Sequence, residues 1–69
     1  MRGAEVKKIR EDQGLNQSEF ARRYNLCLRS LQRWEAGGEK LRPSTQIMLK
    51  LIRDDPGLVH EVVQEVRGW

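Results

Sequence analysis

Hydrophobic residues recur along the chain at the spacing of short amphipathic helices, and turn-forming residues stand between them. Val6 and Ile9 lie three positions apart within a helix-forming segment, residues 4–13. Gly14 follows at the position that a glycine takes when it ends a helix. This pattern predicts a first helix over residues 4–13.

A second helix is predicted over residues 17–24, because its start carries two signals. Asn16 is a favoured N-cap residue, and Glu19 stands where its carboxylate can return a hydrogen bond to the cap. Leu15 and Phe20 occupy the two positions of a hydrophobic staple across the same start. The helix is therefore expected to begin just after this cap.

A sharp turn separates the second helix from a third one, predicted over residues 28–36. Asn25 tolerates the left-handed backbone conformation that ends a helix, and only residues 25–27 connect the two helices. Two helices joined by so short a turn are typical of a helix-turn-helix unit. Cys27 would be the N-cap of the third helix, although cysteine is a weak cap.

A fourth helix is predicted to start after Pro43, with Ser44 as its N-cap. Its apolar residues recur at the i, i+1, i+4, i+5 spacing of a helix face that is turned toward a core. This predicted core stripe consists of Ile47, Met48, Leu51 and Ile52.

A fifth helix is predicted with Asp55 as N-cap and Pro56 as its first residue. Apolar residues follow at the same spacing, namely Leu58, Val59, Val62, Val63 and Val66. Valine is a weaker helix former, so the run VVQEV also permits a short strand. Such a strand would have no partner, and the helix is favoured.

These segments predict an all-α fold, a compact bundle of about five short helices in a single domain, residues 1–69. A chain of 69 residues, 38% of them hydrophobic, closes around one small core, which supplies roughly 3–5 kcal/mol. Cys27 and His60 are the only cysteine and histidine, which excludes a disulfide and a structural zinc site. Helix packing, with or without dimerisation, must stabilise the fold, and Cys27 is expected to be a buried structural thiol.

Charge is divided unevenly along the chain. Residues 1–53 hold 12 Lys and Arg against 6 Asp and Glu, whereas residues 54–69 hold 1 against 4. A basic body and a net charge of +3 fit a polyanion such as nucleic acid, although charge alone does not decide the partner.

Catalytic and membrane functions find no support in the sequence. It has no set of metal ligands, no nucleophile beside a base and no glycine-rich phosphate loop, so we expect neither catalysis nor a cofactor. No apolar run reaches the roughly 18 residues of a membrane span, and the N-terminus lacks the apolar region of a secretory signal. We therefore expect a cytoplasmic protein.

The third predicted helix carries two different faces. At roughly 100° per residue, Leu31 and Trp34 fall on one side. The opposite side gathers the polar residues Arg29, Gln32 and Arg33. Arginine and glutamine form paired hydrogen bonds with the edges of guanine and adenine in the major groove. The alternative is an ordinary solvated face, but the short turn before the helix favours DNA recognition.

The stretch LNQSEFARRYNLCLRSLQRWEAG resembles the Cro and cI-type (XRE-type) helix-turn-helix domains. In that family the second helix begins with Gln, an Ala sits in its middle, and a Trp-Glu-x-Gly run closes the third helix. The matching residues are Gln17, Glu19, Ala21, Leu31, Arg33, Trp34, Glu35 and Gly37. The resemblance spans residues 5–52 and implies a lambda-repressor-like fold that binds double-stranded DNA. The ending PSTQIMLKLIRDDPGLVHEV is also similar to the close of the DNA-binding domain in certain type II antitoxins.

The resemblance implies a role for each residue that would face DNA. Arg29, Gln32 and Arg33 would read base edges, and Arg29 stands nearest the helix start. Gln17 would meet a phosphate or brace a neighbouring reader, unless it is an ordinary exposed residue. Leu28 would touch a thymine methyl group or simply cover the edge of the core.

Four further residues are implied around that helix. Lys40 and Arg42, in the loop after it, would clamp phosphates or be solvated. Arg10 and Glu35 would form a partly buried ion pair that joins the first helix to the third, and its role would be structural.

The resulting hypothesis is a sequence-specific DNA-binding transcription regulator, with repression as its expected action. We expect a homodimer on a palindromic site, formed through the C-terminal helix with Trp69 beyond it, unless that helix only closes the monomer. The alternative is an antitoxin of a type II toxin–antitoxin pair, which would bind a toxin protein and regulate its own operon. No segment is long enough to be a separate toxin-binding part, which favours a regulator or an excised DNA-binding domain.

Overall fold

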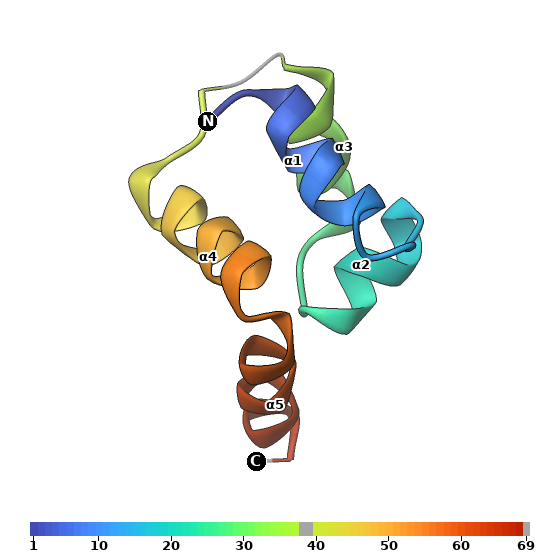
Figure 1. Ribbon diagram of the computed structural model, residues 1–69, viewed down its shortest axis with the longest axis vertical. Helices are drawn as coiled ribbons and strands as arrows, with labels where there is room; N and C mark the ends of the chain where they lie inside the picture. Colours follow the sequence, from blue (N-terminus) through green and yellow to red (C-terminus); the bar gives the residue numbers. More distant parts are fainter. Residues whose placement is uncertain (38–39, 69) are drawn as a thin grey trace.

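The computed structural model describes residues 1–37 and 40–68 and holds five helices (Figure 1). They are α1 (Gly3–Glu11), α2 (Gln17–Arg23), α3 (Leu28–Ala36), α4 (Pro43–Asp54) and α5 (Pro56–Arg67). The described residues contain no strand, and the valine-rich run belongs to α5, so the all-α prediction is confirmed. In Figure 1, α1, α2 and α3 lie together, α4 lies across from them, and α5 extends away at the lower end.

The first helix packs closely against the third. α1 starts one residue earlier and ends two residues earlier than predicted. A Cβ atom added at Gly3 would lie only 2.6 Å from the carbonyl oxygens of Trp34 and Glu35, so the glycine permits this approach. Gly14, with a φ of 70°, makes the left-handed turn that follows α1.

The turn between α2 and α3 forms as predicted. The backbone N–H of Glu19 donates to Asn16 Oδ1 over 2.8 Å, and the N–H of Asn16 donates to Glu19 Oε1 over 2.9 Å. Asn25 adopts a φ of 55°, and the N–H of Leu26 donates to the carbonyl of Ala21 over 2.7 Å. These local hydrogen bonds fix the direction in which α3 leaves α2.

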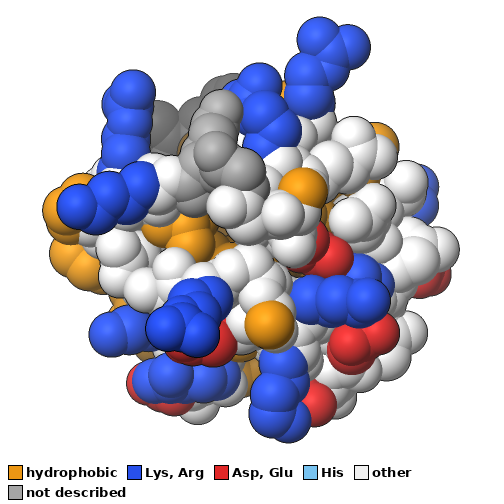
Figure 2. Space-filling view, turned by 90° about the horizontal axis from the view of Figure 1, so that it is seen from above, with side chains coloured by type: hydrophobic (Ala, Val, Ile, Leu, Met, Phe, Trp, Pro, Cys, Tyr) orange, Lys and Arg blue, Asp and Glu red, His pale blue; other side chains and the backbone are white. Residues whose placement is uncertain are grey.

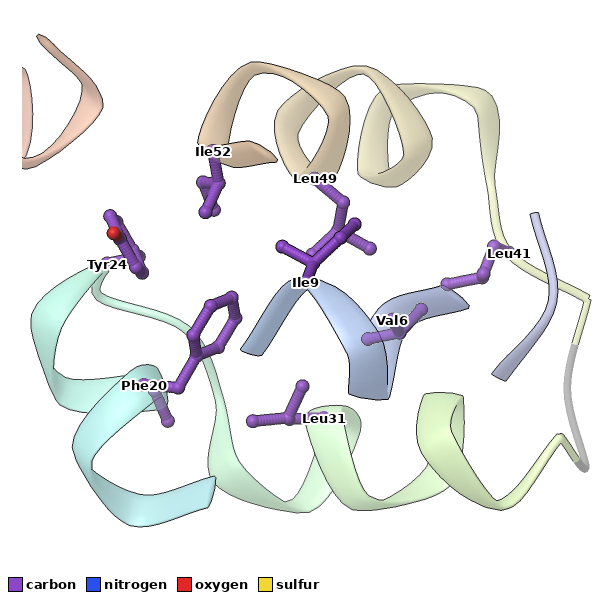
Figure 3. Close-up of a cluster of buried hydrophobic side chains, with 9 residues drawn as sticks. Val6, Ile9, Phe20, Tyr24, Leu31, Leu41, Leu49 and Ile52 are labelled. Atoms are coloured by element: carbon purple, nitrogen blue, oxygen red, sulfur yellow. The ribbon is translucent and has the colours of Figure 1, made fainter. Parts of the chain in front are cut away.

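The core lies between α4 and the first three helices (Figure 3). Phe20 and Tyr24 of α2 meet edge to face with ring centroids 5.0 Å apart. The buried apolar residues of the described parts of the chain are Val6, Ile9, Phe20, Ala21, Tyr24, Leu31, Leu41, Leu49 and Ile52. Trp34, predicted to belong to the core, is only partly buried and packs against it from the edge.

The predicted cap of α4 is wrong. The N-cap is Arg42 and Pro43 is the first residue of the helix, so the helix begins two residues earlier than a cap at Ser44 would place it. Proline suits that position because its fixed φ is already helical and its missing N–H would have no partner inside the helix.

The predicted core stripe of α4 is largely wrong as well. Of its four members only Ile52 is buried, together with Leu49, which the stripe omitted. The other three are 61% (Ile47), 42% (Met48) and 54% (Leu51) exposed. Both stripes have helical spacing, and the side that the rest of the fold covers is the one with Leu49 and Ile52.

The fifth helix begins as predicted but contributes no fully buried side chain. The Asp55 side chain accepts a hydrogen bond from the N–H of Leu58 over 3.3 Å, which is the expected cap. Val59 is partly buried against the core cluster. Trp69 lies outside the described residues. None of the helices that the structure describes is long and apolar enough to span a membrane.

Candidate nucleic-acid interface

The third helix presents one face to the core and the other to solvent. Leu31 is fully buried, so it anchors the middle of α3. The predicted base readers on the opposite face, Arg29, Gln32 and Arg33, are all exposed. Leu28, at the start of the helix, is 37% exposed and remains accessible beside them. The structure therefore brings the four residues together on one outward surface.

A bidentate ion pair fixes α3 against α1. Arg10 Nε donates to Glu35 Oε2 over 2.8 Å, and Arg10 Nη2 donates to Glu35 Oε1 over 2.8 Å. The remaining Nη1 group of Arg10 donates to the carbonyl of Leu15 over 3.0 Å, just before α2. Only 11% of the Arg10 side chain and 7% of the Glu35 side chain are exposed. One guanidinium thus ties three elements of the fold to a single orientation.

Gln17 joins the same network. Its side-chain N–H donates to Glu35 Oε1 over 3.3 Å, so the amide group braces the acid that holds α3. The bracing considered for Gln17 was that of a base reader, whereas its side chain contacts Glu35 of the structural ion pair, and its backbone lies in the first turn of α2. The side chain is partly buried, unlike those of the base-reading candidates.

The ion pair stays charged at neutral pH. Burial by itself would raise the pKa of Glu35, but hydrogen bonds from Arg10 and Gln17 and the positive charge of Arg10 outweigh it, and the pKa is lowered. The hydrogen bond to Glu35 in turn raises the pKa of Arg10. The two charges therefore stabilise each other inside the fold.

A polar groove of about 310 Å³ lies where α3 approaches the start of α4. Its lining residues are Ser30, Arg33, Trp34, Lys40, Arg42 and Thr45. The structure thereby brings the predicted phosphate clamps, Lys40 and Arg42, beside Arg33, which also donates to Ser30 Oγ over 3.4 Å. Sequence reasoning missed the two hydroxyl groups, of Ser30 and Thr45. Thr45 lies in the first turn of α4 with either cap, and no sequence signal indicated that this turn would share a groove with α3.

Lys and Arg side chains project from one part of this end of the molecule. Figure 2 looks from above onto the upper end of Figure 1, and the side chains that project from the upper part of the view are those of Lys and Arg. In the middle and lower parts of the view Asp and Glu side chains lie among further Lys and Arg side chains. A surface of this kind attracts the phosphate backbone of a nucleic acid.

Comparison with known proteins assigns the chain to a family. A model of the helix-turn-helix family matches residues 6–54, which is 49 of 69 residues and runs from within α1 to the end of α4. The chain belongs to the Cro/cI-type (XRE-type) helix-turn-helix family. This is a family of DNA-binding transcription regulators. Searches of curated proteins and of solved structures gave no significant match.

The helix-turn-helix domain exposes its cysteine, so the prediction of a buried thiol is wrong. Cys27 is the residue before α3, where the turn from α2 lies at the surface and leaves the side chain uncovered. The backbone N–H and the hydroxyl of Ser30, followed by the backbone of Arg29, lower the pKa of the Cys27 thiol. The thiol therefore adjoins the surface formed by Leu28 and Arg29.

Proposed function

We propose that the protein is a sequence-specific regulator of transcription that inserts α3 into the major groove of double-stranded DNA. The observation that carries the proposal is the division of α3 into an anchored face and an exposed one. Leu31 and the Arg10–Glu35 pair hold the helix, while Arg29 and Gln32 extend from its free side. A rigid helix with free bidentate donors suits the reading of base edges.

The exposed residues divide into two proposed roles. Arg29, Gln32 and Arg33 read base edges, because they project from the face of α3 opposite Leu31. Lys40 and Arg42 bind phosphates, because they line the polar groove beyond the end of that face. Leu28 adds an apolar contact to a thymine methyl group. Gln17 acts indirectly, through its hydrogen bond to Glu35.

The proposed active form is a homodimer joined through α5 on a palindromic operator, with half-sites about 10–10.5 base pairs apart, one turn of the duplex. A dimer bound to such an operator represses transcription because it blocks access to the DNA it covers. The antitoxin alternative shares this DNA-binding step and adds a toxin protein as a second partner. A small toxin gene beside this one, whose product forms a complex with the purified chain, would favour the antitoxin over a plain repressor.

Selection of bound sequences from random DNA, followed by fluorescence anisotropy at several salt concentrations, tests the proposal. Arg29→Ala is expected to lose discrimination of roughly 1–3 kcal/mol at one base position. Lys40→Ala is expected to weaken binding to every sequence about equally and to reduce the salt slope by about one. Lys8→Ala is the control, since Lys8 is an exposed lysine of α1 that pairs with Asp12 over 3.2 Å.

Two outcomes would contradict these assignments. If Arg29→Ala weakens all duplexes by one common factor, Arg29 contacts phosphate and the reading role passes to Gln32 and Arg33. If the selection enriches no sequence at all, the protein does not read DNA in the proposed way.

A further inference from the structure

The polar groove between α3 and the start of α4 is larger and more basic than contact with one DNA phosphate requires. Its volume of about 310 Å³ falls within the range of roughly 300–1,000 Å³ that is typical of small-molecule sites. Arg33, Lys40 and Arg42 bring three positive charges to its walls, whereas each phosphate of duplex DNA carries one negative charge. None of the described residues that line the groove is an acid. The groove therefore suits a small anion with several charges.

An aromatic side chain lines the same groove. Trp34 is partly buried against the core, and its indole also forms part of the groove wall beside the cations. The backbone of a duplex offers no aromatic group to such a ring, because the bases are stacked inside the double helix. The base of a free nucleotide has an open π-face that can stack on an indole. The indole is therefore suited to a ligand that carries both a base and phosphates.

Two hydroxyl groups complete the wall. Ser30 Oγ accepts a hydrogen bond from Arg33 Nη2 over 3.4 Å, which directs this guanidinium along the groove. Thr45 lies in the first turn of α4 and lines the groove opposite α3. A hydroxyl group can donate to a phosphate oxygen, as lysine and arginine do. The side chains of α3 and α4 thus supply donors for phosphates next to a ring for a base.

We propose that the polar groove binds a nucleoside triphosphate, whose base stacks on Trp34 and whose phosphates contact Lys40, Arg42 and the hydroxyl of Thr45. A chain of three phosphates carries several negative charges, which the cations of the groove balance. The ligand occupies the residues that the proposed function assigns to DNA phosphates, so nucleotide and operator compete. This competition rests on the proposed function, whereas nucleotide binding itself does not.

Tryptophan fluorescence of the full chain without DNA tests the proposal. The chain has two tryptophans, so Trp69→Phe leaves Trp34 as the single reporter. ATP is expected to quench this fluorescence to saturation, and GTP should do the same, because stacking on an aromatic ring tolerates every base. ATP should bind about fivefold or more tightly than inorganic triphosphate, since stacking of the base adds to the phosphate contacts. Adenosine, which lacks phosphates, should bind more weakly than ATP.

Substitutions in the groove locate the ligand. Lys40→Ala and Thr45→Val should each weaken ATP binding about fivefold or more, because each removes a donor to a charged phosphate. Lys8→Ala is the matched control and should leave the affinity unchanged, since Lys8 is an exposed lysine of α1 that pairs with Asp12. Trp34→Leu should reduce the affinity for ATP to that for inorganic triphosphate, which titration calorimetry measures without the tryptophan reporter.

Circular dichroism of each variant verifies that it remains folded. If Trp34→Leu unfolds, the other two variants still decide, because Lys40 is exposed and valine preserves the shape of Thr45. Equal affinities for ATP and inorganic triphosphate would overturn the proposal, because the groove would then recognise charge alone. Lys40→Ala and Thr45→Val with wild-type affinity for ATP would also overturn it, because the ligand would then bind elsewhere.

Anisotropy of a labelled duplex obtained by sequence selection separates this inference from the proposed function. ATP should displace the wild-type chain from the duplex at lower concentration than inorganic triphosphate does at the same ionic strength. A chain that binds ATP in the groove but has no DNA sequence preference would support the nucleotide site and contradict the DNA-reading proposal. A chain that selects a DNA sequence but whose Trp34 fluorescence ATP leaves unchanged would overturn the nucleotide site and leave the reading role of α3 intact.

Discussion

Removal of Arg10 is expected to be among the most damaging single changes in this chain, although Arg10 belongs to neither the apolar core nor the DNA-facing surface. Arg10→Met keeps a long side chain but removes two hydrogen bonds to Glu35 and one to the Leu15 carbonyl. The Glu35 side chain, 7% exposed, would then remain inside the fold without its cation.

The expected loss of unfolding free energy follows from the burial of Glu35. Breaking a buried pair by removing one partner typically costs about 3–5 kcal/mol, whereas replacing both partners with apolar residues is often neutral. A core of this size supplies roughly the same 3–5 kcal/mol in total. Arg10→Met should therefore be largely unfolded at neutral pH, and Arg10→Met/Glu35→Met should be folded again.

The pH dependence of stability gives a second test, because the pKa of Glu35 should shift in opposite directions in the wild type and in Arg10→Met. The pKa of Glu35 is lowered in the wild-type fold, so its stabilisation is present above the unfolded value of about 4.3 and is lost as the pH falls through the folded value. In Arg10→Met, burial acts on a carboxylate without its cation and should raise that pKa. The loss of unfolding free energy in Arg10→Met, relative to the wild type, should then be largest at neutral pH and should shrink as acid protonates Glu35.

Urea denaturation followed by circular dichroism, at neutral and mildly acidic pH, measures these differences. Lys8→Met is the control, because the Lys8–Asp12 pair is 75% and 62% exposed and should contribute no more than about 0.5 kcal/mol. Arg10→Met with wild-type stability would refute the reasoning. A double variant no more stable than Arg10→Met would also refute it, because the loss would then not come from the stranded carboxylate.

Two further predictions concern the backbone. Gly3→Ala should destabilise the fold although alanine favours helices, because its Cβ atom would lie 2.6 Å from two carbonyl oxygens of α3. Gly57→Ala is the matched control, since nothing lies within 4 Å of a Cβ atom added there, and it should be neutral or stabilising by up to about 1 kcal/mol. The thermal midpoint of Gly3→Ala should therefore fall below that of the wild type while that of Gly57→Ala does not, and equal shifts would contradict the close contact. Asn16→Ala should cost about 1 kcal/mol through loss of the cap of α2, and a urea midpoint equal to that of the wild type would show that the capping box adds nothing.

The sequence predicted best those parts of the fold that depend on neighbouring residues. The cap formed by Asn16 and Glu19, the left-handed Asn25 and the bounds 28–36 of α3 all follow from signals within a few positions of each other. The residues that form such interactions can be identified without knowledge of the rest of the fold, because capping bonds and turn conformations are local.

The parts that the sequence did not predict depend on distant contacts. α4 offers two apolar stripes, and only the placement of the first three helices decides that Leu49 is covered and Ile47 is not. Cys27 gave no signal of its exposure, because the sequence does not show what lies over a turn.

The candidate site divides in the same way. The exposed face of α3 follows from helical spacing alone. The groove that joins Ser30 and Thr45 to the basic residues depends on where the fold places the start of α4 relative to α3, which no spacing reveals.

The buried residues that hold α3 in place are distinct from the exposed residues on the outer faces of α4 and α5. Among the residues that the structure describes, every buried side chain lies within residues 6–52, and α5 supplies none of them. Substitutions along the outer faces of α4 and α5 therefore leave the packing that orients α3 untouched. After a gene duplication, two descendants could acquire mutually incompatible pairing surfaces in a few steps while both still recognised the ancestral operator. The same separation would let either descendant change its operator without losing its own partner.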